Sequence, residues 1–304
     1  MTARGRLVRL ALASAAFLTW APFGLAGLPL AGLLVLTPHP SRRERLAALV
    51  AGMPSVALLA LPDHDVLSAM FRAYIVLVTA AFLVLTLVAP APLLRQAARA
   101  SGIALITTLA LGRLVLGEGL FDILRWAVGR AAVAPLGLVM QSFPDLYPAA
   151  LTVTRVLSEI VPATLLLQTF AGLALAWQWY HHLARAPYGA PLAPFREFRF
   201  ADAWVWGIVA GLLVCTTPLL TRFHGAALNL LVVLGSLYLL RGAAVAVACA
   251  AAVGLSATAL GVGLAVSAVL ALPLLLIVPG LTTLGLSDTW LEFRRRLPGR
   301  STPS

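Results

Sequence analysis

Long uncharged apolar segments, separated by short arginine-bearing segments, are the feature that most constrains the fold of this chain. Residues 66–88 contain one charged side chain, Arg72, and residues 243–286 contain none. About 20 apolar residues are enough for a helix to cross the hydrocarbon core of a bilayer. Charged residues make up 11% of the chain, against ~25% in soluble domains. We therefore predict an all-α polytopic transmembrane helix bundle of roughly 8–10 spans with one amphipathic surface helix. Residues 1–304 are expected to form a single integral membrane domain.

The 22 basic side chains are all arginine, and the net charge is +11. Most of them occur in short clusters between the apolar runs, at residues 4–9, 42–45, 95–99, 185–199 and 294–300. This distribution is typical of the cytoplasmic loops of membrane proteins and not of a nucleic-acid-binding surface. We expect a multi-pass protein of the bacterial cytoplasmic (inner) membrane, with both termini in the cytoplasm. The lipid bilayer is then its main partner, and no nucleic-acid partner is expected.

The expected spans are residues 10–18, 23–36, 46–61, 66–88, 101–116, 149–180 and 201–220, followed by the apolar region 226–286. Residues 117–148 mix charged and apolar residues at helical spacing, which predicts an amphipathic helix on the outer surface.

Arg241 interrupts the last apolar region and leaves two alternatives. If Arg241 is interfacial, a short span ends before it and two more follow. If it is mid-span, one long helix continues to about Gly254. We prefer the first alternative, because an even number of spans places both termini in the cytoplasm.

Two charges in residues 149–180 stand out because the run around them is apolar. Glu159 lies about ten residues into the expected span, near the bilayer midplane, and Arg155 lies one turn earlier, where the two side chains can pair. A carboxylate at that depth is costly unless it is paired, neutral or in a wet cavity. We expect Glu159 to face the interior of the bundle, held by Arg155, and Pro162 to kink the helix. The alternative is a structural ion pair, or a helix that starts later and leaves both charges at the interface.

Sequence fingerprints of enzymes are missing. The chain has no phosphate-binding loop, no Gly-x-Ser-x-Gly motif and no histidine pair four residues apart. Asp63-His64-Asp65 indicates a polar turn, because a metal site needs more ligands. Cys215 and Cys249 lie in apolar runs and indicate neither a disulfide framework nor a metal site. We expect no enzymatic activity, no cofactor and no bound metal.

The C-terminal end carries the most specific motif. Residues 284–296 read Leu-Gly-Leu-Ser-Asp-Thr-Trp-Leu-Glu-Phe-Arg-Arg-Arg. Gly285 is expected to end a helix, Ser287 or Asp288 to cap a short one, and the arginines to reach lipid phosphates. The motif Gly-Leu-x-Asp-x-Trp-x-x-Phe-Arg resembles the closing motif of the YybS-like family, bacterial integral membrane proteins of unknown function.

Two other stretches fit this resemblance: residues 194–204, and residues 229–242, in which Arg241 stands where the family usually has glutamine. The resemblance implies a polytopic bundle and brings no established activity. A weaker similarity runs to the substrate-binding subunits of energy-coupling-factor vitamin importers. Their first helix also carries small residues four apart, like Ala11 and Ala15 here, a spacing that permits close helix contact.

These observations favour a binding or transport subunit for a small solute, with Glu159, Arg155 and Arg241 as the substrate-binding residues. Other membrane proteins or ATPase subunits are its expected partners. The alternative is a non-transporting scaffold for cell-envelope or division machinery. Ionisable residues that face one another would favour the first function, and the same residues facing lipid or a flat groove would favour the second.

Overall fold

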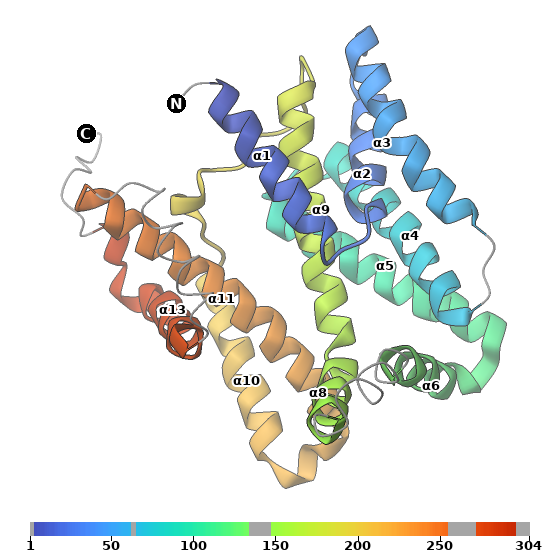
Figure 1. Cartoon of the computed structure of the whole chain (residues 1–304), viewed down its shortest axis with the longest axis vertical. Helices are drawn as coiled ribbons and strands as arrows, with labels where there is room; N and C mark the ends of the chain where they lie inside the picture. Colours follow the sequence, from blue (N-terminus) through green and yellow to red (C-terminus); the bar gives the residue numbers. More distant parts are fainter. Residues whose placement is uncertain (1–2, 62–64, 134–146, 255–271, 296–304) are drawn as a thin grey trace. The chain divides into compact units, whose positions relative to one another are not determined.

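The computed structural model describes residues 3–61, 65–133, 147–254 and 272–295, and every regular element in these ranges is a helix (Figure 1). The all-α fold class is therefore confirmed. The chain divides into two compact units, Met1–Leu192 and Ala193–Ser304, and each is described by itself. Whether the whole chain acts as a single domain stays a prediction. The Asp63-His64 part of the expected polar turn lies outside the described residues.

Unit 1 is built around the short helix α2 (Gly24–Leu36), which packs against α3, α4 and α9. Its core joins Leu25, Leu33 and Leu34 of α2 to Phe82 of α4 and Trp177 of α9. The α2 and α9 backbones approach closely, because a Cβ at Gly172 would lie 2.7 Å from the carbonyl oxygen of Leu25. The unit contains, in chain order, α1 (Ala3–Leu18), α2, α3 (Arg42–Ala60), α4 (Val66–Val88), α5 (Leu93–Leu116), α6 (Leu120–Val133), α8 (Tyr147–Glu159) and α9 (Val161–Leu183).

The start of α3 is fixed by a capping box. The Ser41 side chain accepts a hydrogen bond from the backbone N–H of Glu44, and the Glu44 carboxylate accepts one from the backbone N–H of Ser41. The other carboxylate oxygen, Oε1, accepts a hydrogen bond of 2.7 Å from the backbone N–H of Arg185, just beyond α9. Glu44 is therefore buried although it lies in the first turn of a helix. Hydrogen bonds from Ser41 and from the Arg185 backbone lower the pKa of the Glu44 carboxyl from 4.5 to about 2.

This bound carboxylate predicts a pH-dependent contribution to stability. Because the pKa of Glu44 is lower in the folded than in the unfolded chain, its contribution is present above pH 4.5 and is lost as the pH falls towards about 2. Glu44→Gln should lower the melting temperature at about pH 6 and much less at about pH 3, when followed by thermal unfolding in detergent. An equal loss at both pH values would contradict this prediction.

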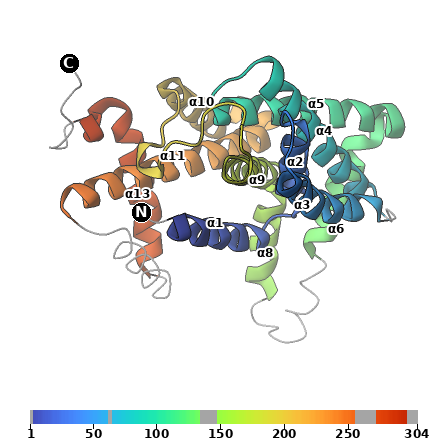
Figure 2. The same cartoon turned by 90° about the horizontal axis from the view of Figure 1, so that it is seen from above.

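The predicted helix at residues 149–180 is two helices. α8 ends at Glu159, Ile160 leaves the helical conformation with φ −96° and ψ 8°, and α9 begins at Val161. Pro162 stands in the first turn of α9, where its missing N–H costs no helical hydrogen bond. It therefore starts a helix and does not kink one. α8 points along the line of sight in Figure 1 while α9 lies across it, and Figure 2 shows the reverse.

Like α8, helix α6 points along the line of sight in Figure 1, and it packs against α8. Leu120 and Ala127 are buried, whereas Asp122, Arg125 and Arg130 are exposed, so the amphipathic character predicted for this segment is confirmed. α5 ends at Leu116, and the next residue, Gly117, has a φ of 69° that allows the sharp change of direction before α6. Residues 134–146 of the predicted surface segment lie outside the described residues.

Unit 2 is built from α10 (Val205–Thr216), α11 (His224–Ala252) and α13 (Leu272–Leu291), with α11 packed against the other two. α11 runs unbroken through Arg241 and is followed by Gly254 at φ 83°. The preferred alternative, a helix that ends before Arg241, is therefore wrong. The described part of the unit also has short 3-10 turns at Phe195–Glu197, Asp202–Trp204, Pro218–Phe223 and Phe293–Arg295.

The described residues contain four helical stretches that are long and apolar enough to cross a bilayer, which confirms a polytopic membrane protein. They are Val66–Val88, Leu93–Ala131, Val161–Leu183 and Pro218–Ala252, and Gly24–Leu36 and Asp202–Thr216 are shorter apolar helical stretches. The precise number of spans stays a prediction.

Candidate functional site

Arg241 lies at the centre of a buried ion-pair network in unit 2. Its side chain is 1% exposed, and it is the largest fully buried side chain among the described residues. Its Nε donates to Asp288 Oδ2 at 3.0 Å, and its Nη1 donates to Asp202 Oδ1 at 2.7 Å. Asp288 is fully buried, whereas the Asp202 side chain is 62% exposed. α11, α13 and the turn before α10 are thus joined through one guanidinium group.

Arg294 completes the network from the turn that follows α13. Its Nη2 donates to the same Asp288 Oδ2 at 2.7 Å, and its Nη1 donates to the backbone carbonyls of Arg196 and Phe198 at 3.2 and 3.0 Å. Arg294 is 4% exposed. The expectations that this arginine reaches lipid phosphates and that Asp288 caps a helix are therefore wrong. Asp288 lies inside α13 and binds two arginines.

The network brings together the three stretches that carry the sequence resemblance: residues 194–204, residues 229–242 and the C-terminal motif. Sequence reasoning singled out Arg241 but not its partners Asp202, Asp288 and Arg294. A signal was present, because a cation in an apolar helix requires a nearby carboxylate and Asp288 is the one acidic residue in the apolar part of the motif.

This arrangement resembles a structural ion-pair network that joins helices more than an open ligand-binding site. Two arginines face two aspartates, and the Phe200 ring lies 5.6 Å from the Arg241 guanidinium and 4.9 Å from the Tyr238 ring. Within the described ranges, Asp288 Oδ1 and Arg294 Nε are buried without a hydrogen-bond partner. Arg241 thus meets ionisable residues, as the solute-binding hypothesis requires, but its guanidinium is already occupied by carboxylates of the chain.

The other two predicted site residues lie in unit 1. Arg155 and Glu159 both belong to α8, and both side chains are exposed. The expectation that Glu159 faces the interior of the bundle is therefore wrong, because the helix carrying it runs across the spans and ends at that residue. Exposure agrees with the alternative in which both charges lie at the interface. Their role as substrate-binding residues, with Arg241, stays a prediction.

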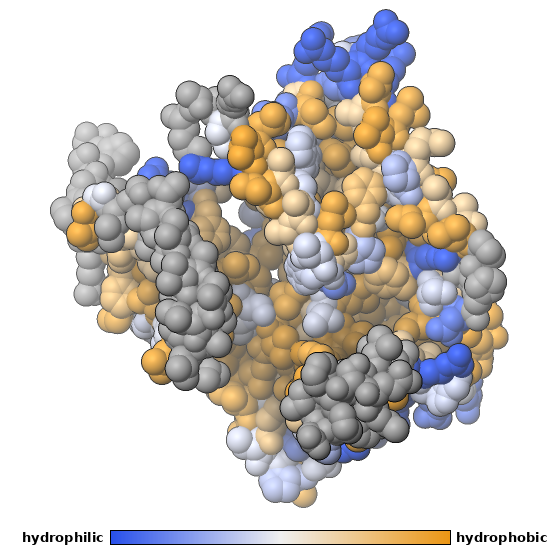
Figure 3. All heavy atoms as spheres, viewed as in Figure 1, coloured by the Kyte–Doolittle hydropathy of each residue, from blue (hydrophilic) through white to orange (hydrophobic). Residues whose placement is uncertain are grey.

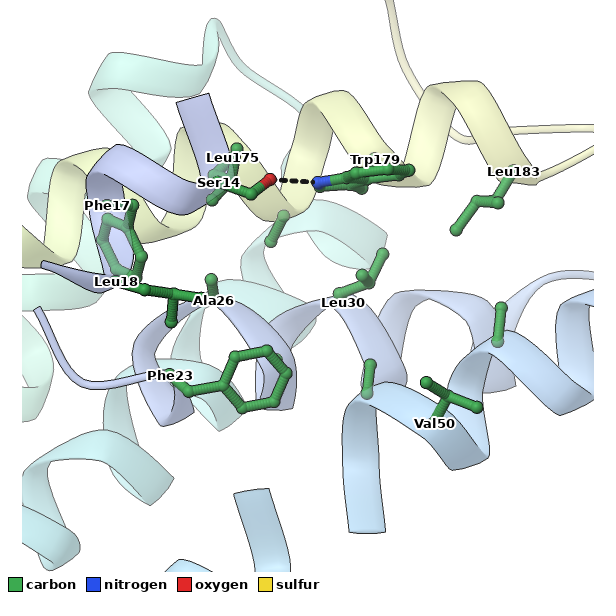
Figure 4. Close-up of a pocket in the computed structure, with 14 residues that line it drawn as sticks. Ser14, Phe17, Leu18, Phe23, Ala26, Leu30, Val50, Leu175, Trp179 and Leu183 are labelled. Carbon is green, nitrogen blue, oxygen red and sulfur yellow. Dashed lines mark hydrogen bonds between the residues drawn. The ribbon is translucent and has the colours of Figure 1, made fainter. Parts of the chain in front are cut away.

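A cavity of about 280 Å³ opens in unit 1 where α1, α2, α3 and α9 converge (Figure 4). Almost all of its lining is apolar, and no charged residue contributes to it. The lining residues are Ser14, Phe17, Leu18, Phe23, Ala26, Gly27, Leu30, Ala47, Val50, Ala51, Leu175, Ala176, Trp179 and Leu183.

The polar groups of this cavity are bound to each other or to backbone. Trp179 Nε1 donates to Ser14 Oγ at 2.8 Å, and Ser14 Oγ donates to the carbonyl oxygen of Leu10 at 2.8 Å. Neither side chain therefore demands a polar partner from a ligand. The space suits an apolar group, since an alkyl or aromatic moiety gains by leaving water and loses no hydrogen bond.

Helix α1 is the wall of the cavity with the fewest attachments. Only Leu10 and Phe17 are buried among its residues from Gly5 onward, and a second, more open hollow of about 430 Å³ lies between α1 and α9. Besides the Ser14–Trp179 bond, the connection is a hydrogen bond from the Gln168 side chain to the carbonyl oxygen of Trp20. α1 therefore packs on α9 through few side chains, with space on both sides.

The comparisons place the chain among membrane proteins without naming an activity. The profile of a family described as predicted membrane protein (DUF2232) matches residues 141–289. The match includes Arg155, Glu159, Arg241 and Asp288, and it ends before Arg294. No curated protein and no solved structure matches the chain. The resemblances to the YybS-like family and to the vitamin importers accordingly stay predictions.

Proposed function

We propose that this chain is a membrane-embedded binding subunit for a small solute and that it serves a transport system. The observation that carries the proposal is the apolar cavity between α1, α2, α3 and α9, into which side chains of four helices converge. Sites for small molecules are concave, mostly apolar and furnished with few polar groups. The cavity has these properties, and its volume corresponds to a small ligand or to one chain of a larger one. The loosely attached α1 offers a wall that can move for entry and release.

A cavity-filling substitution tests this proposal. Ala47 lines the cavity, so Ala47→Leu should occlude it, whereas Ala57→Leu adds the same atoms to an exposed site on the same helix. Mass spectrometry of small molecules released from the purified proteins should find a compound with the wild type and Ala57→Leu. Ala47→Leu should have lost most of it while keeping its melting temperature. The same compounds in equal amounts from both variants would contradict the proposal.

A scaffold for cell-envelope or division machinery is the second candidate. The exposure of Arg155 on helix α8 favours it, because a charge on an exposed helix face can contact another protein. Purification in mild detergent with identification of the retained proteins separates the two functions. An ATPase pair would support transport, and envelope proteins would support the scaffold. Under either function we expect no enzymatic activity and no nucleic-acid partner.

We place the protein in the bacterial cytoplasmic membrane with both termini in the cytoplasm. In unit 1 the arginine-bearing start of α3 and the loop after α9 lie together, joined by the bond between Glu44 and the Arg185 backbone. Figure 3 shows hydrophilic side chains gathered where α3 begins. Cytoplasmic loops are enriched in arginine.

A labelling experiment tests this orientation. A cysteine at the exposed position Ala190, with Cys215 and Cys249 replaced by serine, should resist an impermeant thiol reagent in intact cells and react after permeabilisation. Labelling of intact cells would reverse the orientation.

A further inference from the structure

We propose that the ligand of the unit 1 cavity is an anionic amphiphile, with its alkyl chain in the cavity and its phosphate or carboxylate head at Arg43 and Arg185. This inference rests on the proposed binding function and names the class of its ligand. These two residues are called the arginine pair below. Both side chains are exposed.

The start of α3 and the loop after α9 lie together at one end of the cavity. The hydrogen bond of 2.7 Å between Glu44 and the Arg185 backbone joins the first turn of α3 to the loop after α9. The Tyr188 hydroxyl fastens this loop further by donating to the carbonyl oxygen of Leu36 at 3.3 Å. Arg43 precedes the cavity residue Ala47 by one turn and lies on the same side of α3. Arg43 and Arg185 thus lie at the same end of the cavity.

Glu44 offsets part of the charge of this pair, because its carboxylate attracts Arg185 electrostatically. Both of its oxygens accept backbone hydrogen bonds, from Ser41 and Arg185, and its side chain is buried. The guanidinium groups of Arg43 and Arg185 stay exposed at the mouth of an uncharged cavity. The positive-inside rule explains why arginines lie at this end of the unit, but not why an apolar hollow opens directly beside them.

Together the two features fit one ligand class. A guanidinium group binds a phosphate or carboxylate through paired hydrogen bonds, and the cavity wall offers an alkyl chain apolar contact without unmet polar groups. A cavity of about 280 Å³ receives one alkyl chain and not a pair. The amphiphile has two sources: a lipid of the surrounding bilayer that inserts one chain, or a soluble alkyl phosphate. The chemistry recognised is the same.

Tryptophan quenching by brominated chains tests the proposal, because Trp179 lines the cavity and bromine quenches indole fluorescence on contact. The full-length protein is placed in vesicles of phosphatidylcholine, and the signal of Trp179 is taken as the difference from Trp179→Phe. Three probes with brominated chains are added: phosphatidylglycerol, phosphatidylcholine and a soluble alkyl phosphate. We expect an anionic probe to quench Trp179 at a lower mole fraction than phosphatidylcholine. Stronger quenching by phosphatidylglycerol assigns a lipid ligand, and stronger quenching by the alkyl phosphate assigns a soluble one.

The arginine pair is tested with Arg43→Gln combined with Arg185→Gln, which should raise the anionic probe concentration for half-maximal quenching by about fivefold or more. The matched control, Arg95→Gln with Arg99→Gln, removes two exposed arginines from α5, which does not line the cavity. It should leave that concentration unchanged. Equal quenching of Trp179 by anionic and zwitterionic probes, or equal effects of the two double variants, would overturn the proposal. The proposed binding function would still stand if Ala47→Leu lost its co-purifying compound, so the two can fail separately.

Discussion

Asp288→Asn should destabilise the protein by about 3–5 kcal/mol, because it removes the buried carboxylate that binds two arginines. Arg241 and Arg294 are 1% and 4% exposed, so neither guanidinium group can turn to water without moving the helices. Asparagine has almost the same shape as aspartate, so the loss would come from the charge and not from a cavity. Thermal or denaturant unfolding of the purified protein in detergent measures the effect.

Two comparisons isolate the cause of that loss. Asp288→Leu combined with Arg241→Met removes both partners, and it should cost less than the sum of the two single changes because no unpaired charge remains between them. Asp202→Asn breaks the contact of Arg241 with a side chain that is 62% exposed, and it should cost only about 1 kcal/mol or less. Additive effects in the double variant would show that Arg241 and Asp288 are not coupled.

Gly242→Ala and Gly285→Ala should each force α11 and α13 apart and destabilise the protein by about 3 kcal/mol or more. A Cβ at Gly242 would lie 1.8 Å from the carbonyl oxygen of Leu281, and one at Gly285 would lie 2.0 Å from that of Tyr238. Both obstacles are backbone atoms, so no side-chain rotation relieves the overlap. Denaturant unfolding in detergent again gives the magnitude.

The matched control for these substitutions lies on α11 itself. A Cβ at Gly235 meets no atom within 4 Å, so Gly235→Ala should stabilise the helix by about 0.5–1 kcal/mol through the higher helix propensity of alanine. If Gly242→Ala and Gly285→Ala unfold at the same denaturant concentration as the wild type, the close contact between α11 and α13 is not formed.

Helix positions followed from the sequence where local signals sufficed. Residues 66–88 were expected as a helix and form α4 with the same bounds, since Asp65 precedes the apolar run and Pro90 follows it. The prediction failed at residues 149–180, where the apolar run continues through a break at Ile160. Hydropathy indicates that a segment prefers lipid or the protein core. It does not indicate that the two halves of the segment, here α8 and α9, run in different directions.

The Arg241 network and the unit 1 cavity differ in how much of each could be predicted from the sequence. Arg241 was conspicuous as a cation in an apolar helix, but its partner Asp288 is 47 residues away and only the packing of α11 on α13 brings them together. The cavity in unit 1 had no local signal at all. Its lining residues are the leucines, alanines and phenylalanines of ordinary spans, and a hollow arises from the spacing of four helices.

The burial of α2 has a consequence for the order in which the chain is assembled in the membrane. At 13 residues, or ~20 Å, α2 is shorter than the ~30 Å hydrocarbon core. Its close neighbour α9 is synthesised only after α3, α4, α5, α6 and α8, yet Gly172 of α9 meets the Leu25 backbone directly. α2 is therefore synthesised and inserted before α9, the helix against which it packs, has been made. A ribosome stalled before α9 would leave an unfinished bundle whose central helix is open to lipid, a form that membrane quality control can recognise.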